Sequence, residues 1–281
     1  MEITTYNDVK IPAFMYGTAW KKEATTGLVE LAVEAGFKAI DTANQLIHYD
    51  EARVGEALLR LQERGVERES LFLQTKFTSV NGQDHRTPYD ASADLTTQVQ
   101  QSVASSLEHL HTDYLDSYVL HGPYSRVGIT DSDREVWAAI EELYRKGTAK
   151  IIGVSNVSAS QLDELCRGSN VKPMVVQNRC YASQGWDEGV RSICRRENII
   201  YQGFSLLTAN PGVLSHPQVR AIATRLSATP AQVVFRFSLD VGMLPLTGTT
   251  SKEHMQQDLQ ALDLELTPEE VRAIESIAVR V

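Results

Sequence analysis

The sequence lacks several features that would each define a class of protein. Its three cysteines are an odd number without the paired spacing of a metal site: Cys166, Cys180 and Cys194. It also lacks a low-complexity tract and an apolar run long enough for a signal peptide or a membrane span. These absences favour a soluble, cytoplasmic protein whose thiols stay reduced and whose functional site holds no metal.

Positive charge is also scarce in this chain. Lys and Arg number 27 against 36 Asp and Glu, which gives a formal net charge of −9. Nucleic acids and anionic membranes bind concentrated basic faces, so we expect neither as a partner, and a small molecule instead. No linker rich in Pro, Gly or Ser divides the 281 residues, so we expect residues 1–281 to form one domain, as a monomer or weak homodimer.

Strand-like and helix-like patterns alternate along the whole chain. Short apolar runs rich in strand formers predict strands at 13–17, 38–41, 71–76, 115–120, 149–154, 173–177, 199–204 and 243–247. Amphipathic spacing predicts helices at 26–35, 50–64, 95–110, 133–146 and 159–167. Continuously apolar strands alternating with helices indicate an α/β protein of the (β/α)8 barrel class, the TIM barrel.

An open, doubly wound sheet is the structural alternative. Such sheets usually carry a Gly-x-Gly-x-x-Gly turn after their first strand, and Gly17-Thr18-Ala19-Trp20 is not such a turn.

Polar side chains stand where several of the apolar runs end. They are Asp41, Tyr49, Lys76 and His121. The carboxyl ends of parallel barrel strands converge on one face, where barrel enzymes build their active sites. These four residues, far apart in the sequence, are therefore expected to meet in one pocket.

Several motifs in this order and spacing resemble those of the aldo-keto reductases. They are Gly17-Thr18-Ala19-Trp20, Gly36 to Ala43, Glu51-Ala52-Arg53-Val54-Gly55, Thr75-Lys76, Leu120-His121, Gly153-Val154-Ser155-Asn156 and Val176-Gln177-Asn178. The resemblance extends from Asn7-Asp8 to Gly248-Thr249-Thr250 and so spans nearly the whole chain. It implies a (β/α)8 barrel that reduces aldehydes and ketones with a nicotinamide cofactor, usually the phosphorylated form.

The resemblance assigns a role to each of the four polar residues. Tyr49 would donate the proton, and the charge of Lys76 would lower the phenol pKa from its ordinary value of about 10. Asp41 would keep Lys76 charged and oriented, and His121 would orient the carbonyl oxygen.

The position of the tyrosine allows other candidates. Counting five residues from Asp41, as in most of the family, gives Leu46, and counting back from Glu51 gives His48 beside Tyr49. A similar branch of the family carries His-Tyr at this point, and a phenol is the better proton donor for this chemistry. We therefore choose Tyr49, with His48 as the alternative donor.

The resemblance also implies a cofactor site and a substrate site. The cofactor would be bound by a set of residues spread over the chain: Thr18, Asp41, Ser155, Asn156, Gln177, Phe204, Ser205, Leu207, Gly248, Thr249, Thr250, His254 and Asp258. Within this set, Phe204 would stack on the nicotinamide ring. The substrate would contact Trp20, His121 and Tyr124, between walls formed by the loops 81–91, 124–130 and 181–186.

The sequence departs from the family pattern where the adenosine 2′-phosphate would bind. Many members carry a lysine at the position of Gly248 and an arginine at that of His254. Without these charges we still expect NADP(H), with NAD(H) as the alternative. Only residues 278–281 follow the last predicted helix, so we expect the pocket to be open on that side.

A second function is compatible with the same fold. Barrels serve many chemistries, so the alternative is a cofactor-sensing or regulatory subunit, or a non-redox lyase or isomerase. An intact set of Asp41, Lys76 and Tyr49 favours the reductase, because a binding module does not need it.

Overall fold

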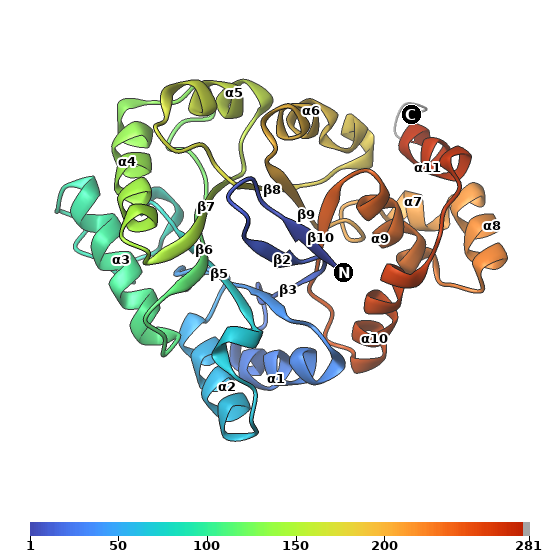
Figure 1. The fold of residues 1–281 in the computed structure, drawn as a ribbon, viewed down its shortest axis with the longest axis horizontal. Coiled ribbons are helices and arrows are strands. Elements are labelled where there is room, and N and C mark those ends of the chain that lie inside the picture. The colour runs from blue at the N-terminus through green and yellow to red at the C-terminus, as the bar shows by residue number, and fades with distance from the viewer. Residues whose placement is uncertain (278–281) are drawn as a thin grey trace.

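A computed structural model describes residues 1–277 and contains a closed barrel of parallel strands (Figure 1). The barrel strands are β3 (Met15–Gly17), β4 (Ala39–Asp41), β5 (Phe72–Phe77), β6 (Leu115–Leu120), β7 (Ala149–Ser155), β8 (Val175–Arg179), β9 (Ile200–Phe204) and β10 (Met243–Thr247). Each strand pairs with the next in chain order, and β10 pairs with β3 to close the ring. The structure thus confirms the predicted (β/α)8 barrel.

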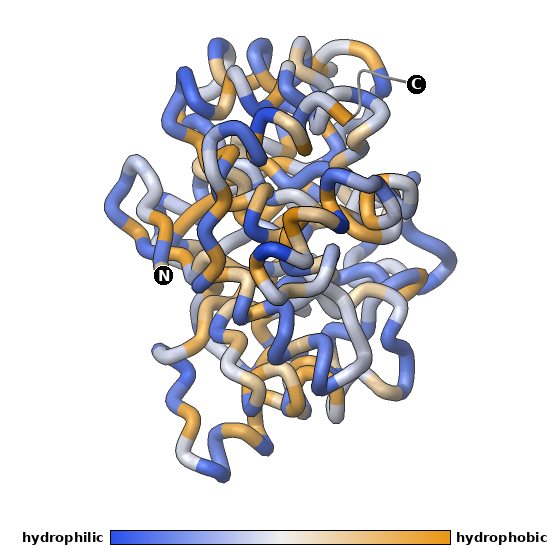
Figure 2. The backbone as a smooth tube through the Cα atoms, turned by 90° about the vertical axis from the view of Figure 1, so that its right-hand side faces the viewer, coloured by the Kyte–Doolittle hydropathy of each residue, from blue (hydrophilic) through white to orange (hydrophobic). Residues whose placement is uncertain are grey.

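Helices surround the barrel on its outside (Figure 1). They are α1 (Thr25–Ala35), α2 (Glu51–Glu63), α3 (Leu95–His109), α4 (Asp131–Arg145), α5 (Ala159–Gly168), α6 (Glu188–Glu197), α7 (Pro211–Ser215), α8 (Pro217–Leu226), α9 (Pro230–Asp240), α10 (Lys252–Gln260) and α11 (Pro268–Glu275). Figure 2 shows hydrophilic and hydrophobic residues interspersed along the chain, including its outer segments. Among these described residues, no helix has the length and hydrophobicity needed to cross a membrane.

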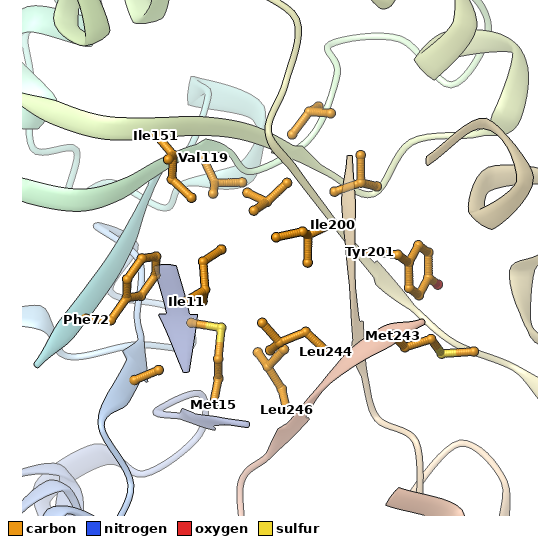
Figure 3. Close-up of a cluster of buried hydrophobic side chains, with 14 of the residues drawn as sticks. Ile11, Met15, Phe72, Val119, Ile151, Ile200, Tyr201, Met243, Leu244 and Leu246 are labelled. Carbon is orange, nitrogen blue, oxygen red and sulfur yellow. The ribbon is translucent and has the colours of Figure 1, made fainter. Parts of the chain in front are cut away.

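The core fills the barrel with apolar side chains. Every residue of β5 and β6 is buried, as expected for strands covered on one side by helices and on the other by the barrel interior. Figure 3 shows Met15, Phe72, Val119 and Leu244 pointing toward one another from different strands. These side chains block the barrel axis, so a ligand site has to lie at an end of the barrel.

An antiparallel hairpin closes one end of the barrel. Its strands are β1 (Glu2–Thr4) and β2 (Lys10–Pro12), and it lies across the barrel centre in Figure 1. Ile11 is fully buried beside Met15 (Figure 3). The family resemblance began at Asn7-Asp8, but the sequence did not indicate this pairing. The opposite end, where the strands reach their carboxyl termini, stays available for a site.

Two predicted boundaries need correction. The sixth barrel strand was expected at 173–177 but runs from Val175 to Arg179, since Pro173 lacks the N–H that a strand interior donates. The helix expected at 133–146 begins at Asp131, because Thr130 caps it through a reciprocal pair of hydrogen bonds with Asp133. The expectation that the pocket is open beyond the last helix depends on residues 278–281, which lie outside the described residues.

Candidate active site

A cavity of about 700 Å³ opens at the carboxyl ends of the barrel strands. Its lining includes most of the residues expected to form the site: Trp20, Asp41, Tyr49, His121, Ser155, Asn156, Gln177, Phe204, Ser205, Leu207, Gly248, Thr249, His254 and Asp258. Most of them come from strand ends or the loops that follow them, whereas His254 and Asp258 lie on α10, so the parallel barrel brings most of the set together as expected. The volume is in the range typical of small-molecule and cofactor sites.

A buried ion pair lies below the cavity floor. Lys76 on β5 is fully buried and donates to Asp41 Oδ1 on β4 at 2.6 Å and to the carbonyl oxygen of Thr42 at 2.8 Å. Burial lowers the Lys76 pKa, and the charge of Asp41 opposes that shift. The carboxylate of Asp41 therefore favours the charged form of Lys76 in this structure.

Buried glutamines extend this polar layer. Gln74 and Gln177 each donate to Asp41 Oδ1, at 2.8 and 3.0 Å, and both also donate to Gln202 Oε1. Gln202 in turn donates to Gln74 Oε1 at 3.0 Å. Sequence reasoning missed Gln74 and Gln202, although a glutamine inside an apolar strand is a usable signal, because a buried amide requires polar partners. The layer fixes the carboxylate that holds Lys76.

Tyr49 is the candidate phenol that lies beside the ion pair. Its ring centroid is 5.2 Å from Lys76 Nζ and 5.9 Å from the His121 ring. His48 instead packs on the Trp20 ring with 4.2 Å between centroids, and Leu46 is exposed. Of the three sequence candidates, Tyr49 is the one that the fold brings to both Lys76 and His121.

The expected direction of the tyrosine pKa is wrong for this structure. One side of the Tyr49 ring faces the cavity, yet surrounding protein raises the pKa of the phenol, and the nearby carboxylate of Asp41 raises it further. The ammonium of Lys76 donates hydrogen bonds to Asp41 and Thr42 and not to the phenol oxygen. The phenol is therefore protonated at neutral pH, and Nζ of Lys76 lies 5.2 Å from the centroid of its ring.

His121 follows β6 and faces the cavity beside Tyr49. Its Nδ1 lies 2.6 Å from Thr78 Oγ1. Burial, with smaller effects from Lys76 and His48, lowers the His121 pKa to about 3. The imidazole is therefore neutral at physiological pH and offers one N–H.

Amide and hydroxyl groups cluster on the next strands. Asn156 donates to the carbonyl oxygen of His121 at 2.8 Å, and Ser155 donates to the carbonyl oxygen of Gln177 at 2.5 Å. Asn156 and Ser205 both adopt left-handed backbone conformations, with φ of 56° and 57°. Such conformations cost energy in residues other than glycine and concentrate at functional sites. Phe204, at the end of β9, also lines the cavity.

The far end of the cavity lies at the N-terminus of α10. Ser251 caps this helix by accepting from the backbone N–H of His254, and Thr249 is anchored through its carbonyl oxygen by the Tyr16 hydroxyl at 2.9 Å. Helix N-termini attract anions because unpaired N–H groups and the helix dipole converge there.

Lys21 supplies a cation at this end, which sequence reasoning missed. It lies in the loop after β3, lines the cavity, and donates from Nζ to the carbonyl oxygen of Gly248. Burial lowers the Lys21 pKa. Gly248 has no side chain to carry the charge common in the family, but an ammonium from a different loop lies beside it.

A buried carboxylate lies deeper on α10. Asp258 lines the cavity and accepts from the Thr247 hydroxyl at 2.7 Å. Burial raises the Asp258 pKa to about 6, and the hydrogen bond from Thr247 opposes that shift. Asp258 is therefore an acceptor whose charge changes near neutral pH.

Some expected residues do not line the cavity. Thr18 is buried and donates to the carbonyl oxygen of Asp41 at 3.0 Å, so it joins the ends of the first two barrel strands. Thr250 is exposed and is not part of the cavity lining. Lys76 is buried and is also absent from the lining. Tyr124 and the loops 81–91, 124–130 and 181–186 contribute no lining residue. Other lining residues have no assigned role, and they include Thr208, Leu214 on α7, Gln257 on α10, and Thr229, Pro230 and Ala231 at the start of α9.

Known proteins resemble this chain in sequence and in fold. Residues 13–279 match the model of the Aldo/keto reductase family. An aldo-keto reductase of Mycolicibacterium vanbaalenii is 33% identical over 248 residues, covering 88% of this chain and 80% of that protein. The glyoxal reductase of Bacillus subtilis is 29% identical over 278 residues, covering 98% and 92%. A solved aldose reductase structure from Schistosoma japonicum shares the fold, with a TM-score of 0.85 at 22% identity over 100% of this chain and 93% of its own. The chain belongs to the aldo/keto reductase family.

Proposed function

We propose that this protein reduces an aldehyde or ketone to an alcohol with NADPH. Reduction of carbonyl groups is the general chemistry of the family to which the chain belongs. The observation that carries the proposal is the meeting of Tyr49, Lys76 and His121 at one end of the cavity that reaches Lys21 and α10 at its other end.

The cavity fits a nicotinamide dinucleotide in the chemistry of its donors. Ser155, Asn156 and Gln177 offer polar groups for the carboxamide, and Phe204 offers a face for the ring. When bound, the reduced nicotinamide supplies the hydride that the carbonyl carbon receives. Asp258 is placed in this proposal at the adenine end, where a carboxylate accepts hydrogen bonds from amino groups.

Protein side chains supply the proton and stabilise the oxygen. Tyr49 gives its phenolic proton to the carbonyl oxygen, and Lys76 stabilises the negative charge left on the phenol. Asp41 keeps Lys76 charged against the effect of burial. Neutral His121 donates its N–H to the same oxygen and so orients the carbonyl group.

Preference for the phosphorylated cofactor depends in this proposal on Lys21 and on the α10 N-terminus. Lys21 lies beside Gly248, and the hydroxyls of Thr249 and Ser251 flank the first turn of α10. An ammonium that is half-buried interacts with an anion more strongly than one in bulk water, because the local dielectric is lower. These groups would partly replace the cations missing at positions 248 and 254.

The substrate is in this proposal a small-molecule carbonyl compound. The related glyoxal reductase makes glyoxal a reasonable first test compound. When a reactive aldehyde such as glyoxal is added, the purified protein should oxidise NADPH, seen as a fall in NADPH absorbance. Tyr49→Phe is the matched control, in which this fall should be far slower. Cofactor binding without consumption, across a panel of aldehydes and ketones, would reject the reductase and favour a cofactor-sensing or regulatory function.

A further inference from the structure

A buried threonine, Thr78, is hydrogen-bonded to His121, which lines the cavity. A neutral imidazole has one N–H and one acceptor nitrogen, so its two tautomers present opposite groups to the cavity. Thr78 directly follows β5, two residues after Lys76, and is buried with 4% of its surface exposed. Its Oγ1 lies 2.6 Å from His121 Nδ1.

Counting donors favours one tautomer. The Thr78 hydroxyl has one proton, and Nδ1 of His121 is the acceptor that the described residues offer it. If Nδ1 itself carried a proton, the hydroxyl proton would have to turn away and lose its partner in a buried place. If the hydroxyl donates to Nδ1, both groups are paired and no buried donor is left over.

The tautomer matters for the reaction proposed above. We propose that Thr78 is a positioning residue that holds His121 as the Nε2–H tautomer, with this N–H directed at the carbonyl oxygen of the substrate. The opposite tautomer would point a nitrogen lone pair at the carbonyl oxygen, which is repulsive. This inference rests on the proposed carbonyl reduction for its consequence, but the tautomer itself is a property of the resting protein.

Nitrogen-15 NMR of the histidine rings tests the tautomer without any turnover. Protonated and unprotonated ring nitrogens have well-separated resonances, and a His121→Asn variant identifies the His121 signals among the seven histidines. We expect wild-type His121 to show an unprotonated Nδ1 and a protonated Nε2 at neutral pH. A proton on Nδ1 in the wild-type protein would overturn the proposal.

Two matched substitutions separate the hydroxyl from the shape of the side chain. Thr78→Val keeps the methyl group and removes the donor, whereas Thr78→Ser keeps the donor and removes the methyl. Both retain the Thr78 carbonyl oxygen, which accepts from the Tyr89 hydroxyl at 2.7 Å. We expect Thr78→Val to mix the tautomers and to lower kcat about tenfold, the effect of one neutral hydrogen bond, with unchanged affinity for NADPH. Thr78→Ser should keep the Nε2–H tautomer and a kcat near that of wild type.

The outcomes distinguish this inference from the proposed function. An unaltered tautomer and rate in Thr78→Val would show that Thr78 does not set the histidine, even if the enzyme reduces carbonyls. The expected tautomer in a wild-type protein that reduces no carbonyl compound would leave the positioning by Thr78 in place and reject the reductase.

Discussion

Lys76 on β5 and Asp41 on β4 form a buried ion pair with 2.6 Å between Nζ and Oδ1. The two residues are 35 positions apart in the sequence, and the parallel pairing of β4 with β5 joins them. Removing both charges from water is costly, and the pair persists because the carboxylate also accepts from Gln74 and Gln177. This arrangement keeps a positive charge 5.2 Å from the centroid of the Tyr49 ring. The role proposed for this phenol as the proton donor can be tested by substitution.

Replacement of Tyr49 by phenylalanine tests the proton donor. Tyr49→Phe should lower turnover by at least about 10²-fold, the size of a typical acid–base contribution, because the carbonyl oxygen loses its proton source. NADPH affinity, measured by quenching of tryptophan fluorescence, should stay near wild type. His48→Ala is the matched control. Retained activity in Tyr49→Phe together with lost activity in His48→Ala would transfer the role to His48.

The ion pair can be tested from each side. Lys76→Met should abolish activity, because no positive charge is left to stabilise the phenolate. Asp41→Asn should weaken activity and destabilise the fold by about 3–5 kcal/mol, because it leaves a buried ammonium without its counter-charge. Steady-state rates and urea unfolding followed by circular dichroism measure the two effects. Near-normal rates in both variants would contradict the proposed roles of this pair.

Charge substitutions at the α10 end test the cofactor preference. We expect wild type to bind NADPH more tightly than NADH by roughly 10 to 100-fold, with a margin that shrinks as salt rises. Gly248→Lys combined with His254→Arg should widen the margin, because each new charge-assisted hydrogen bond contributes about 1.5–3 kcal/mol. Lys21→Met should narrow it in the wild-type background, because it removes the ammonium beside Gly248.

Fluorescence titration of both cofactors at two salt concentrations would measure these margins. Equal affinities for the two cofactors that stay equal in the double variant would mean that this loop does not bind the 2′-phosphate. If the preference for NADPH over NADH is unchanged in Lys21→Met, Lys21 does not contribute to the 2′-phosphate site, and the rest of the proposed site is unaffected.

The buried carboxylate of Asp258 should make stability depend on pH. Its pKa is raised to about 6 in the folded protein, from an ordinary 3.8, so the folded state binds more protons than the unfolded state between these values. The contribution of Asp258 to stability should therefore fall as pH rises from about 4 to about 6, by a total of about 3 kcal/mol, and stay at the lower level above that range.

Asp258→Asn is the matched variant for this prediction, since the amide oxygen still accepts from the Thr247 hydroxyl. Urea unfolding across the pH range should show the variant more stable than wild type at pH 8, with the difference gone below pH 4. Parallel stability curves for the two proteins would show that Asp258 titrates normally.

Local sequence pattern determined the barrel and much of its chemistry. Runs such as 115–120 are mostly apolar and rich in strand formers, and helices end at residues such as Gly36, whose φ of 117° few other residues adopt readily. These signals require no knowledge of distant residues, so strands and helices alternated as predicted. Placing Asp41 and His121 on one face then followed from the parallel barrel, because all strand ends converge there.

Tertiary structure alone decided how side chains in the loops are directed. The chain between Asp41 and α2 offers Leu46, His48 and Tyr49, and their directions depend on packing against Trp20 and Lys76 from other loops and strands. The same holds for two other pairs, in which Lys21 reaches Gly248 from 227 residues away and Thr78 pairs with His121. Loop backbones lack the periodicity that reveals a buried face, so contacts between distant residues determine which side chains reach the cavity.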